Sequence, residues 1–362
     1  MVKSGKSVCF VIPSLQAGGM ERVMCELANF ISAQENITLH MVLYGRDPSI
    51  FFPLHSAIQL HSPNYSYRES LRLLYAARSL LFLRQQIRHI QPDTILSFGE
   101  YWNSLVLLAL FGVNYPVYIS DRCKPDKKFS KFHTLLRRWL YPRAAGIIAQ
   151  TCLARDIYAE QFRHSRIAVI GNPIRKLLRT IDIQQENLVL TVGRLIQTKH
   201  HNRLIKVFSQ LDANDWKLII IGGNALKQNN SSLLHKLLED LGLKDKVILI
   251  GECNEVDDYY YKSKVFAFTS SSEGFPNVIG EALSAGLPVV SYDCIAGPSE
   301  MISDGENGFL VPVFEDELFL KRLQLLIDDE ELRKKMSVIA TASVEKYSVE
   351  KIGKQYLDFI LS

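Results

Sequence analysis

Short apolar runs alternate with amphipathic stretches along the whole chain. Several runs are rich in β-branched residues and lack polar alternation, which is typical of parallel strands buried on both faces. They predict strands over residues 7–15, 37–45, 93–99, 116–121, 145–151 and 166–173, and over 187–195, 216–223, 246–252, 265–270, 288–293 and 308–312. Helical spacing between the runs predicts helices over 21–34, 68–90, 202–211, 231–241, 278–285 and 316–341.

Two successive series of strand and helix predict an α/β fold with two doubly wound, Rossmann-like domains. We expect a first domain over residues 1–178, a polar linker over 179–187 and a second domain over 188–345. Residues 346–362 predict a C-terminal amphipathic helix. Its periodicity does not select a domain, and we expect it to pack back towards the first one. Ligands of such sheets bind at the carboxyl ends of the strands, so we expect the chemistry in the loops there, in a cleft between the domains.

Composition and cysteine usage favour a cytoplasmic globular protein. The chain is 47% hydrophobic and 22% charged, and its six cysteines are scattered without a C-x-x-C pair. This pattern indicates reduced thiols and neither a disulfide framework nor a zinc site. The apolar stretch over residues 105–113 is far shorter than the roughly 20 residues that span a bilayer. The opening residues lack a basic and then apolar leader, so we expect no export.

The charge is distributed unevenly along the chain. Residues 1–180 carry 23 Lys/Arg and 11 Asp/Glu, whereas residues 181–362 carry 19 and 27. This asymmetry indicates an anionic partner for the first half, either a membrane surface or nucleic acid. The stretch 68–90 could face either lipid or the core. The stretch 124–143 interleaves basic and aromatic residues and favours a membrane or a diphosphate-bearing acceptor, and we expect no nucleic acid because no recognised module for it occurs.

Two loops after predicted strands suit an anion. The loop "PSLQAGGMERV" opens a helix, and Gly18 and Gly19 would let backbone amides approach a phosphate, although Glu21 would repel one placed too near. A flexible turn is the alternative, and the loop is not G-x-G-x-x-G, which argues against a dehydrogenase. In "VGRLIQTKHH", Arg194 and Lys199 stand five apart and suit a diphosphate, although either alone would be an ordinary solvated charge.

The stretch "EGFPNVIGEALSAGLPVVSYD" places two carboxylates, Glu273 and Glu281, on either side of a helix start. We expect Asn277 to cap this helix and the amides near Val278 to point towards a ligand. A solvated loop residue and ordinary helix surface are the alternative for the two glutamates. A nucleotide diphosphate sugar fits the pattern, because amides would hold its phosphates and each carboxylate would accept from sugar hydroxyls.

Several catalytic motifs are absent from the sequence. It contains no D-x-D, H-x-x-x-H, H-E-x-x-H or G-x-S-x-G motif and no P-loop. We therefore expect no metal and no other cofactor. If a diphosphate departs here, Arg194, Lys199 and a helix N-terminus must stabilise its charge.

The segments "LQAGGMER", "VGRLIQTK", "SSSEGFPNVIGEALSAGLPVVSYD" and "GPSEMISDGENGFLV" resemble the retaining GT-B nucleotide-sugar glycosyltransferases, in particular the family 4-like enzymes of bacterial glycan assembly. The resemblance implies two Rossmann-like domains that face each other across a cleft, of which the first binds the acceptor and the second binds the nucleotide sugar. It implies that Arg194 and Lys199 bind the donor diphosphate and that Glu273 contacts the sugar hydroxyls. These three would be the catalytic residues. Further donor contacts are implied for Gly18, Gly19, Gly274, Phe275, Pro276, Asn277, Val278 and, at the ribose, Glu281.

One loop departs from the pattern of the relatives. Many of them carry a histidine where "SDRCKPDKK" places Asp121 and Arg122, which we expect to contact the acceptor or the sugar. The resemblance implies metal-independent, retaining transfer of a hexose or N-acetylhexosamine from a nucleotide diphosphate sugar, with UDP favoured. The acceptor would be a saccharide on a polyprenyl diphosphate, at the inner face of the bacterial inner membrane. A UDP-N-acetylhexosamine epimerase on the same fold, or a catalytically silent binding protein, are the alternatives.

Overall fold

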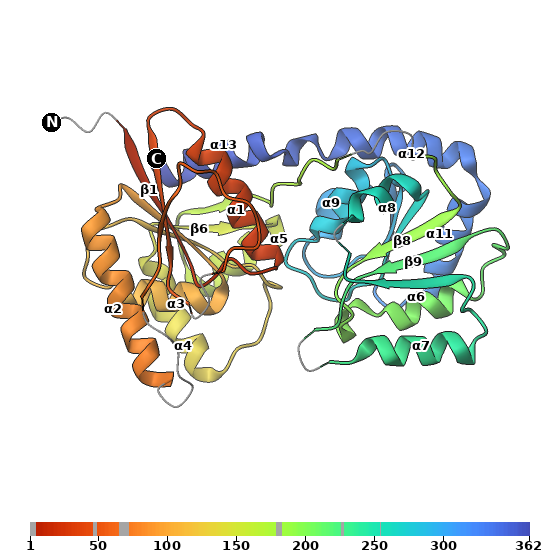
Figure 1. Cartoon of the computed structure of the whole chain (residues 1–362), viewed down its shortest axis with the longest axis horizontal. Coiled ribbons are helices and arrows are strands. Elements are labelled where there is room, and N and C mark those ends of the chain that lie inside the picture. Colours follow the sequence, from red (N-terminus) through yellow and green to blue (C-terminus); the bar gives the residue numbers. More distant parts are fainter. Residues whose placement is uncertain (1–4, 46–48, 65–71, 179–182, 226–227, 254) are drawn as a thin grey trace. The chain divides into compact units, whose positions relative to one another are not determined.

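The computed structural model describes residues 5–45, 49–64, 72–178, 183–225, 228–253 and 255–362. Contacts divide the chain into two compact units, Met1–Pro173 with Tyr347–Ser362, and Ile174–Lys346 (Figure 1). Each unit contains one parallel sheet covered by helices on both faces, which confirms the predicted pair of doubly wound Rossmann-like domains.

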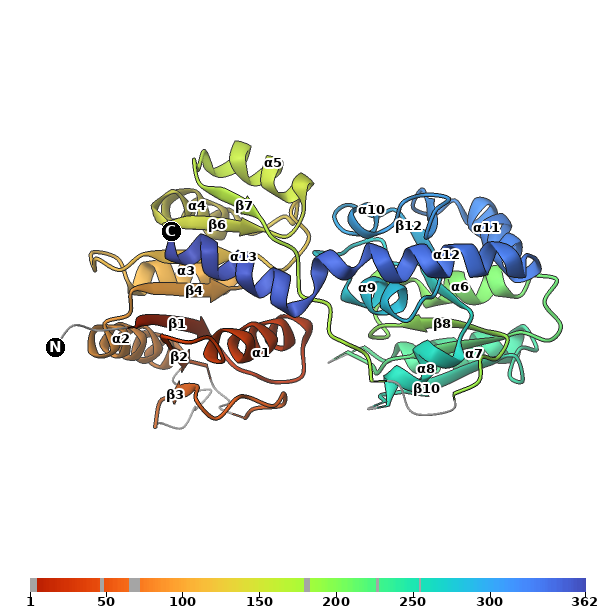
Figure 2. The same ribbon diagram turned by 90° about the horizontal axis from the view of Figure 1, so that it is seen from above.

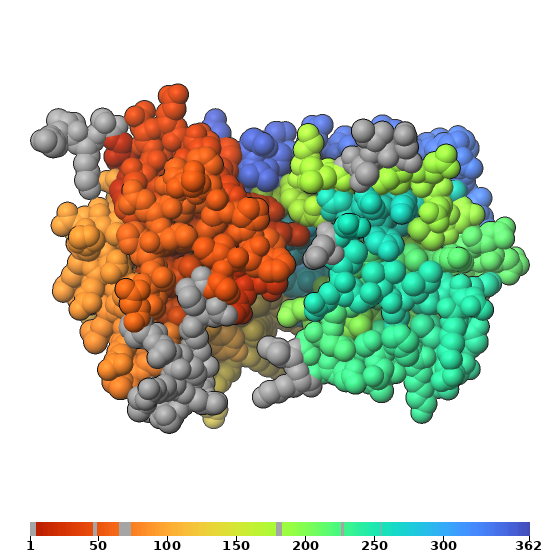
Figure 3. Space-filling view, viewed as in Figure 1, coloured from red at the N-terminus to blue at the C-terminus, as the bar shows by residue number. Residues whose placement is uncertain are grey.

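The first unit is built on a seven-stranded sheet in the order β3-β2-β1-β4-β5-β6-β7. The strands are β1 Lys6–Ile12, β2 Ile37–Leu43, β3 Gln59–His61, β4 Thr94–Phe98, β5 Val117–Ser120, β6 Gly146–Ala149 and β7 Ile167–Val169. Only β3 was not predicted, because it has three residues and largely exposed side chains. It forms one edge of the sheet, on the near face of this unit in the space-filling view (Figure 3).

Helices cover both faces of this sheet. Helices α1 Gly19–Ser32 and α13 Val349–Leu361 lie on one face (Figure 2), where a Cβ on Gly353 would stand 2.2 Å from Phe30 Cδ1. The other face is covered by α2 Arg72–Ile90, α3 Glu100–Ala109, α4 Lys131–Leu140 and α5 Cys152–Phe162.

The described part of the basic stretch 68–90 packs on the protein core. Leu83 and Ile87 of α2 are fully buried in it. Arg84 donates hydrogen bonds of 2.7 and 2.8 Å to the carbonyls of Ala109 and Phe111, at the C-terminal end of α3. This arginine therefore caps a neighbouring helix, a favourable place for a cation.

A polar cluster centred on Asp121 lies inside the first unit. The Asp121 carboxylate accepts hydrogen bonds from Asn103 (2.9 Å) and Tyr141 (2.7 Å) and pairs with Arg137. Both charged side chains of the pair are only 2% exposed. Because α3, α4 and the loop after β5 meet here, these bonds fix the loop that begins at Asp121.

The second unit has a six-stranded sheet in the order β10-β9-β8-β11-β12-β13. The strands are β8 Leu188–Val192, β9 Lys217–Ile221, β10 Val247–Gly251, β11 Val265–Phe268, β12 Val289–Tyr292 and β13 Gly308–Val311. The helices are α6 His201–Phe208, α7 Asn230–Asp240, α8 Val256–Lys262, α9 Asn277–Ser284, α10 Pro298–Met301, α11 Asp316–Asp328 and α12 Glu330–Ser343. The core lies between the sheet and α6, α7 and α11.

Two predictions about this unit need correction. The single helix predicted over 316–341 is two helices, because Asp329 has extended backbone and its side chain caps α12 by accepting from the Leu332 amide at 2.8 Å. The units divide after Pro173 and not after residue 178. Ile174 packs against Gly280 and Arg175 pairs with Asp257, so this segment belongs with the second unit.

The strand orders place one topological switch point in each sheet. It lies between β1 and β4 in the first unit and between β8 and β11 in the second. Loops that follow the two strands leave in opposite directions there and open a crevice at the carboxyl ends. In the second unit these loops carry Arg194, Lys199 and Glu273.

The buried pair in the first unit gives a test of stability. Replacing Arg137 with leucine leaves Asp121 buried without its cation, and we expect the free energy of unfolding of this unit to fall by about 3–5 kcal/mol. Arg155, which pairs with Asp156 at the surface, provides the control, because Arg155→Leu should change it by less than about 1 kcal/mol. Urea-dependent hydrogen exchange of peptides from residues 94–162 measures both. Equal effects of the two substitutions would contradict this role of the buried pair.

Candidate active site

An ion pair joins the two loops at the switch point of the second sheet. Lys199 lies in a single 3-10 turn after β8, and Glu273 lies in the loop between β11 and α9. The Lys199 Nζ and Glu273 Oε1 atoms are 2.5 Å apart, and the two side chains are 16% and 13% exposed. The structure thus brings together two of the residues that the sequence predicts for one site.

Hydrogen bonds between the two loops hold this pair in place. The Thr269 hydroxyl donates to the Lys199 carbonyl (2.9 Å), and the Ser271 amide donates to the Thr198 carbonyl (2.9 Å). The His200 ring lies 2.8 Å from the Ser271 hydroxyl. The "TSSS" sequence before Glu273 therefore serves to attach this loop to the turn that carries Lys199.

Two neighbouring titratable groups add no charge to the site at neutral pH. Burial, with a smaller effect of the Lys199 ammonium, lowers the pKa of His201 to about 4. Burial, and then the Glu273 carboxylate, raises the pKa of Cys294 to about 12. A neutral imidazole and a neutral thiol leave Lys199 and Glu273 as charged groups that can respond to a ligand.

Arg194 lies on the same loop as Lys199. Its side chain is exposed, and within the described residues no hydrogen bond or ion pair of its guanidinium is found. The backbone there is tightly packed, because a Cβ on Gly222 would lie 2.0 Å from the Gly193 carbonyl oxygen. Gly222 also has a φ of 153°, so glycine is required beside this loop.

Glu281 occupies a different environment from Glu273. It is 2% exposed, and its carboxylate accepts from the Tyr260 hydroxyl at 3.0 Å and from Arg175 Nε at 3.3 Å. Arg175 in turn makes a two-pronged pair with Asp257. Tyr260, Arg175 and Asp257 were not predicted as parts of the site. Asp257 and Tyr260 stand three apart on one helix, but nothing in the sequence links that helix to residues 175 and 281.

The segment 274–278 shapes the start of α9. The prediction that Asn277 caps this helix is wrong, because α9 begins at Asn277, the capping position is Pro276 and no side chain caps it. Phe275 and Pro276 are buried, whereas Gly274, Asn277 and Val278 are half-buried. A Cβ on Gly297, which has a φ of 130°, would lie 2.2 Å from Pro276 Cδ, so glycine permits this close packing.

Gly18 and Gly19 belong to the first unit, at the start of α1. A Cβ on Gly18 would lie 2.1 Å from Glu21 Oε2, whereas a Cβ on Gly19 would meet nothing within 4 Å. A carboxylate therefore already lies beside this helix start, where it suits the helix dipole. The electrostatics here favour a hydroxyl-bearing group over a phosphate.

Asp121 and Arg122 also lie in the first unit. Asp121 is 3% exposed and its partners are the three protein donors described above, which is the environment of a structural carboxylate. The Arg122 guanidinium lies 3.4 Å from the Phe98 ring centroid and donates to Asn172 (2.6 Å) and Tyr356 (2.9 Å). It joins the loop after β5 to α13, and contact with an acceptor stays a prediction.

The described residues contain neither a metal-binding cluster nor a membrane-spanning helix. No group of three or more His, Cys, Asp and Glu side chains is placed to hold a metal ion in the part of the chain that the structure describes. Within the same residues, no helix is both long enough and apolar enough to span a bilayer.

Comparison with known proteins identifies two family models in the chain. Residues 17–176 match the model of Glycosyltransferase Family 4, and residues 176–342 match the model of Glycosyl transferases group 1. The two matches meet at residue 176, close to the division between the units.

Two bacterial relatives align with almost the full length of the chain. An amylovoran biosynthesis glycosyltransferase of Erwinia amylovora is 28% identical over 95% of this chain and 96% of its own. An N-acetylgalactosamine-N,N'-diacetylbacillosaminyl-diphospho-undecaprenol 4-alpha-N-acetylgalactosaminyltransferase of Campylobacter jejuni is 29% identical over 97% and 98%.

Solved structures share the fold. The Anabaena protein HepE, in complex with UDP and glucose, superposes with a TM-score of 0.78 at 20% identity and covers 98% of both chains. TarM superposes with a TM-score of 0.80 at 16% identity over 99% of both. With the two family models and these relatives, the chain belongs to the family 4-like glycosyltransferases of the GT-B fold, and it is a transferase.

Proposed function

We propose that the protein transfers a hexose or N-acetylhexosamine from a UDP-sugar to a saccharide carried on a polyprenyl diphosphate, without a metal and with retention of the anomeric configuration. The Lys199–Glu273 pair at the switch point is the observation that carries this proposal. A diphosphate can take the ammonium of Lys199, and sugar hydroxyls can take the carboxylate of Glu273. A single nucleotide sugar would then separate the ion pair and bind both of its members, Lys199 through the diphosphate and Glu273 through the sugar hydroxyls.

The charged groups of this site suit the departure of a diphosphate. Lys199 and the exposed Arg194 can stabilise the negative charge that develops on the leaving group, a task that a metal ion performs in other enzymes. Glu273 orients the sugar and stabilises the positive charge at its anomeric carbon. Glu281, held by Tyr260 and Arg175, offers an oriented carboxylate to the ribose hydroxyls.

In the proposed reaction the acceptor hydroxyl attacks the anomeric carbon on the face from which the diphosphate leaves. The bond from the anomeric carbon to the phosphate oxygen breaks, and its electron pair stays with UDP. The hydroxyl proton passes to that leaving oxygen while the new glycosidic bond forms. Side chains of the protein hold the reactants, and no protein group needs to accept the proton.

The names of similar proteins support the choice of substrates. HepE was crystallised with UDP and glucose, and a Campylobacter relative is named for transfer to a diphospho-undecaprenol-linked saccharide. The same names favour transfer over the epimerase alternative, and the transferase family leaves a catalytically silent protein without support.

An exposed apolar surface on α4 suits contact with the membrane that would carry such an acceptor. Phe132 and Leu135 are 75% and 68% exposed, and Trp139 on the same helix face is 43% exposed. The exposed cations Lys128, Lys131, Arg138 and Arg143 lie on or beside this helix. Apolar side chains that insert among lipids and cations that meet anionic headgroups are the features of an interfacial helix.

Calorimetric titration with UDP and GDP in EDTA tests the donor site. We expect UDP to bind in EDTA and the Lys199→Ala variant to bind it about 10-fold to 100-fold more weakly, because a charge-assisted bond to the diphosphate is lost. Glu273→Gln should bind UDP more tightly, since Lys199 is released from its partner, yet transfer sugar at least about 100-fold more slowly.

Lys217 provides the matched control for the loss of one positive charge. It is exposed at the start of β9, at the opposite end of the strand from the carboxyl edge. Lys217→Ala should therefore leave UDP affinity unchanged. UDP binding that disappears in EDTA, or that falls equally in the Lys199 and Lys217 variants, would contradict the proposed site.

Flotation with lipid vesicles tests the membrane surface. We expect binding to vesicles that contain phosphatidylglycerol and little binding to pure phosphatidylcholine. Phe132→Ser should weaken the binding roughly 10-fold or more, because one large apolar side chain no longer inserts. Val338 is equally exposed, at 75%, but lies on α12 of the second unit, and Val338→Ser should have no effect. Equal binding by both variants would exclude α4 as the contact.

A further inference from the structure

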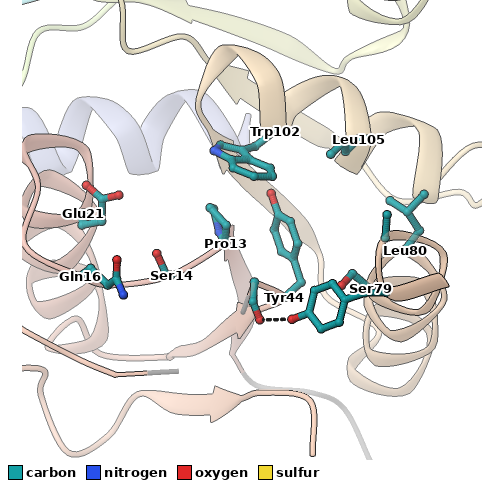
Figure 4. A pocket seen from close by; sticks show the side chains of 12 residues that line it. Pro13, Ser14, Gln16, Glu21, Tyr44, Ser79, Leu80, Trp102 and Leu105 are labelled. Carbon is teal, nitrogen blue, oxygen red and sulfur yellow. Dashed lines mark hydrogen bonds between the residues drawn. The ribbon is translucent and has the colours of Figure 1, made fainter. Parts of the chain in front are cut away.

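The first unit contains a cavity of about 540 Å³, and none of the described residues that line it is among those assigned to the donor sugar nucleotide. Its walls come from the segments that follow β1 and β2 and from α2 and α3, all within one unit (Figure 4). This volume lies in the range of small-molecule sites. The cavity also lies beside the switch point of the sheet, where ligands of doubly wound folds bind.

Two local features show that the cavity is preformed. The Tyr75 hydroxyl of α2 donates a 2.6 Å hydrogen bond to the Gly45 carbonyl just after β2, which closes one wall. Gly99 has a φ of 99°, and a Cβ there would lie 2.9 Å from Trp102 Cδ1. Glycine is thus required at the start of α3 for the Trp102 indole to take its place on the cavity.

Two hydroxyl groups on the cavity wall are buried and unpaired. Tyr44 is 4% exposed and Ser79 is 7% exposed, and neither hydroxyl has a hydrogen-bond partner among the described residues. A buried polar group without a partner destabilises a protein by about 1–3 kcal/mol. Burial also raises the pKa of Tyr44, so its hydroxyl keeps its proton and can donate. A ligand that brings an acceptor to each hydroxyl would satisfy both groups.

The chemistry of the walls selects among the parts of a lipid-linked acceptor. None of the described residues that line the cavity is a lysine or arginine, and Glu21 contributes a carboxylate, so a diphosphate is disfavoured. Ser14, Gln16 and Glu21 make one side polar, which disfavours a hydrocarbon chain (Figure 4). The saccharide is the part whose hydroxyls match these groups.

The opposite side of the cavity is apolar and narrows the class of sugar. Leu80 and Leu105 lie on this side, beyond Tyr44 and Trp102 (Figure 4). An acetamido group combines a carbonyl, which needs buried donors, with a methyl group, which needs apolar contacts. A ring of hydroxyls alone would leave the two leucines against polar atoms.

We propose that this cavity binds an N-acetylhexosamine residue of the acceptor saccharide. The acetamido carbonyl accepts from the Ser79 hydroxyl and its methyl group contacts Leu80 and Leu105, whereas the Tyr44 hydroxyl, beside Trp102, donates to an oxygen of the sugar ring. The sugar ring lies against the Trp102 indole, with its hydroxyls towards the side of Glu21. That the sugar is part of the acceptor rests on the proposed function, whereas the binding itself does not.

Saturation-transfer NMR and titration with methyl N-acetylhexosaminides, without any donor, test the cavity directly. We expect the strongest transfer to the acetyl methyl protons and weaker binding of the corresponding methyl hexosides. Tyr44→Phe keeps the ring and removes one donor, so affinity should fall about 2-fold to 10-fold. Leu105→Trp fills the cavity and should abolish binding.

Ser104 offers a matched control on α3. Its hydroxyl is also buried without a partner among the described residues, but Ser104 does not line the cavity. Ser104→Ala should therefore leave hexosaminide affinity unchanged. UDP titration of the same variants reports on the second unit and should give the wild-type affinity for all of them.

The outcomes separate this proposal from the proposed function. UDP binding with no hexosaminide binding, or with binding that Tyr44→Phe and Leu105→Trp leave intact, would overturn the cavity assignment and leave the donor site standing. Hexosaminide binding that these variants weaken, without UDP binding, would support the cavity and refute the proposed function. Equal binding of methyl hexosides would overturn the acetamido assignment, and displacement by farnesyl diphosphate would assign the cavity to the lipid.

Discussion

The ion pair between Lys199 and Glu273 connects the two loops that diverge at the switch point of the second sheet. Parallel strands impose this arrangement, because every carboxyl end lies at one edge and only the switch point opens a crevice there. Hydrogen bonds from Thr269 and Ser271 to the backbone around Lys199 hold the loops together. The charged groups of the site therefore face a ligand from a scaffold that is formed without it.

The hydrogen-bond and ion-pair partners of a carboxylate determine whether it is structural or can bind a ligand. Asp121 and Glu281 are almost fully buried and are held by protein donors, as a buried charge requires. Glu273 is 13% exposed, and the partner that holds it is Lys199, a cation that a diphosphate can take over. Under the proposed function Glu281 positions the donor through a fixed carboxylate, whereas Glu273 changes partner during each turnover.

Much of the fold could be predicted from the sequence because buried parallel strands appear in it as continuous apolar runs. Among the strands the exception is β3, which has three residues at an exposed edge, too few to produce a pattern. The break between α11 and α12 was not predicted, because the helical spacing of apolar residues continues across it. The residue that marks the break is Asp329, whose side chain caps the start of α12.

The residues of the site were predicted less completely than the fold. Lys199 and Glu273 are found on adjacent loops because both follow predicted strands of one sheet. The partners of Glu281 were missed, since Arg175 is 106 positions away and pairs with it only through tertiary packing. The prediction that Asn277 caps α9 was wrong by one position, which is within the usual uncertainty of helix ends. The cavity beside Tyr44 and Ser79 has no sequence motif, because four separate segments form it.

Under the proposed function, a nucleotide-linked sugar reacts at the Lys199–Glu273 site without a metal and with retention of the anomeric configuration. Time-resolved proton NMR of UDP-sugar cleavage by the purified protein in EDTA measures this directly, with water as the acceptor. UDP-glucose, UDP-galactose and their N-acetylated counterparts are the donors to compare. We predict that the sugar released first is the α anomer, before mutarotation mixes the two forms. A β anomer released first, or cleavage that begins only when Mg²⁺ or Mn²⁺ is added, would contradict the claim.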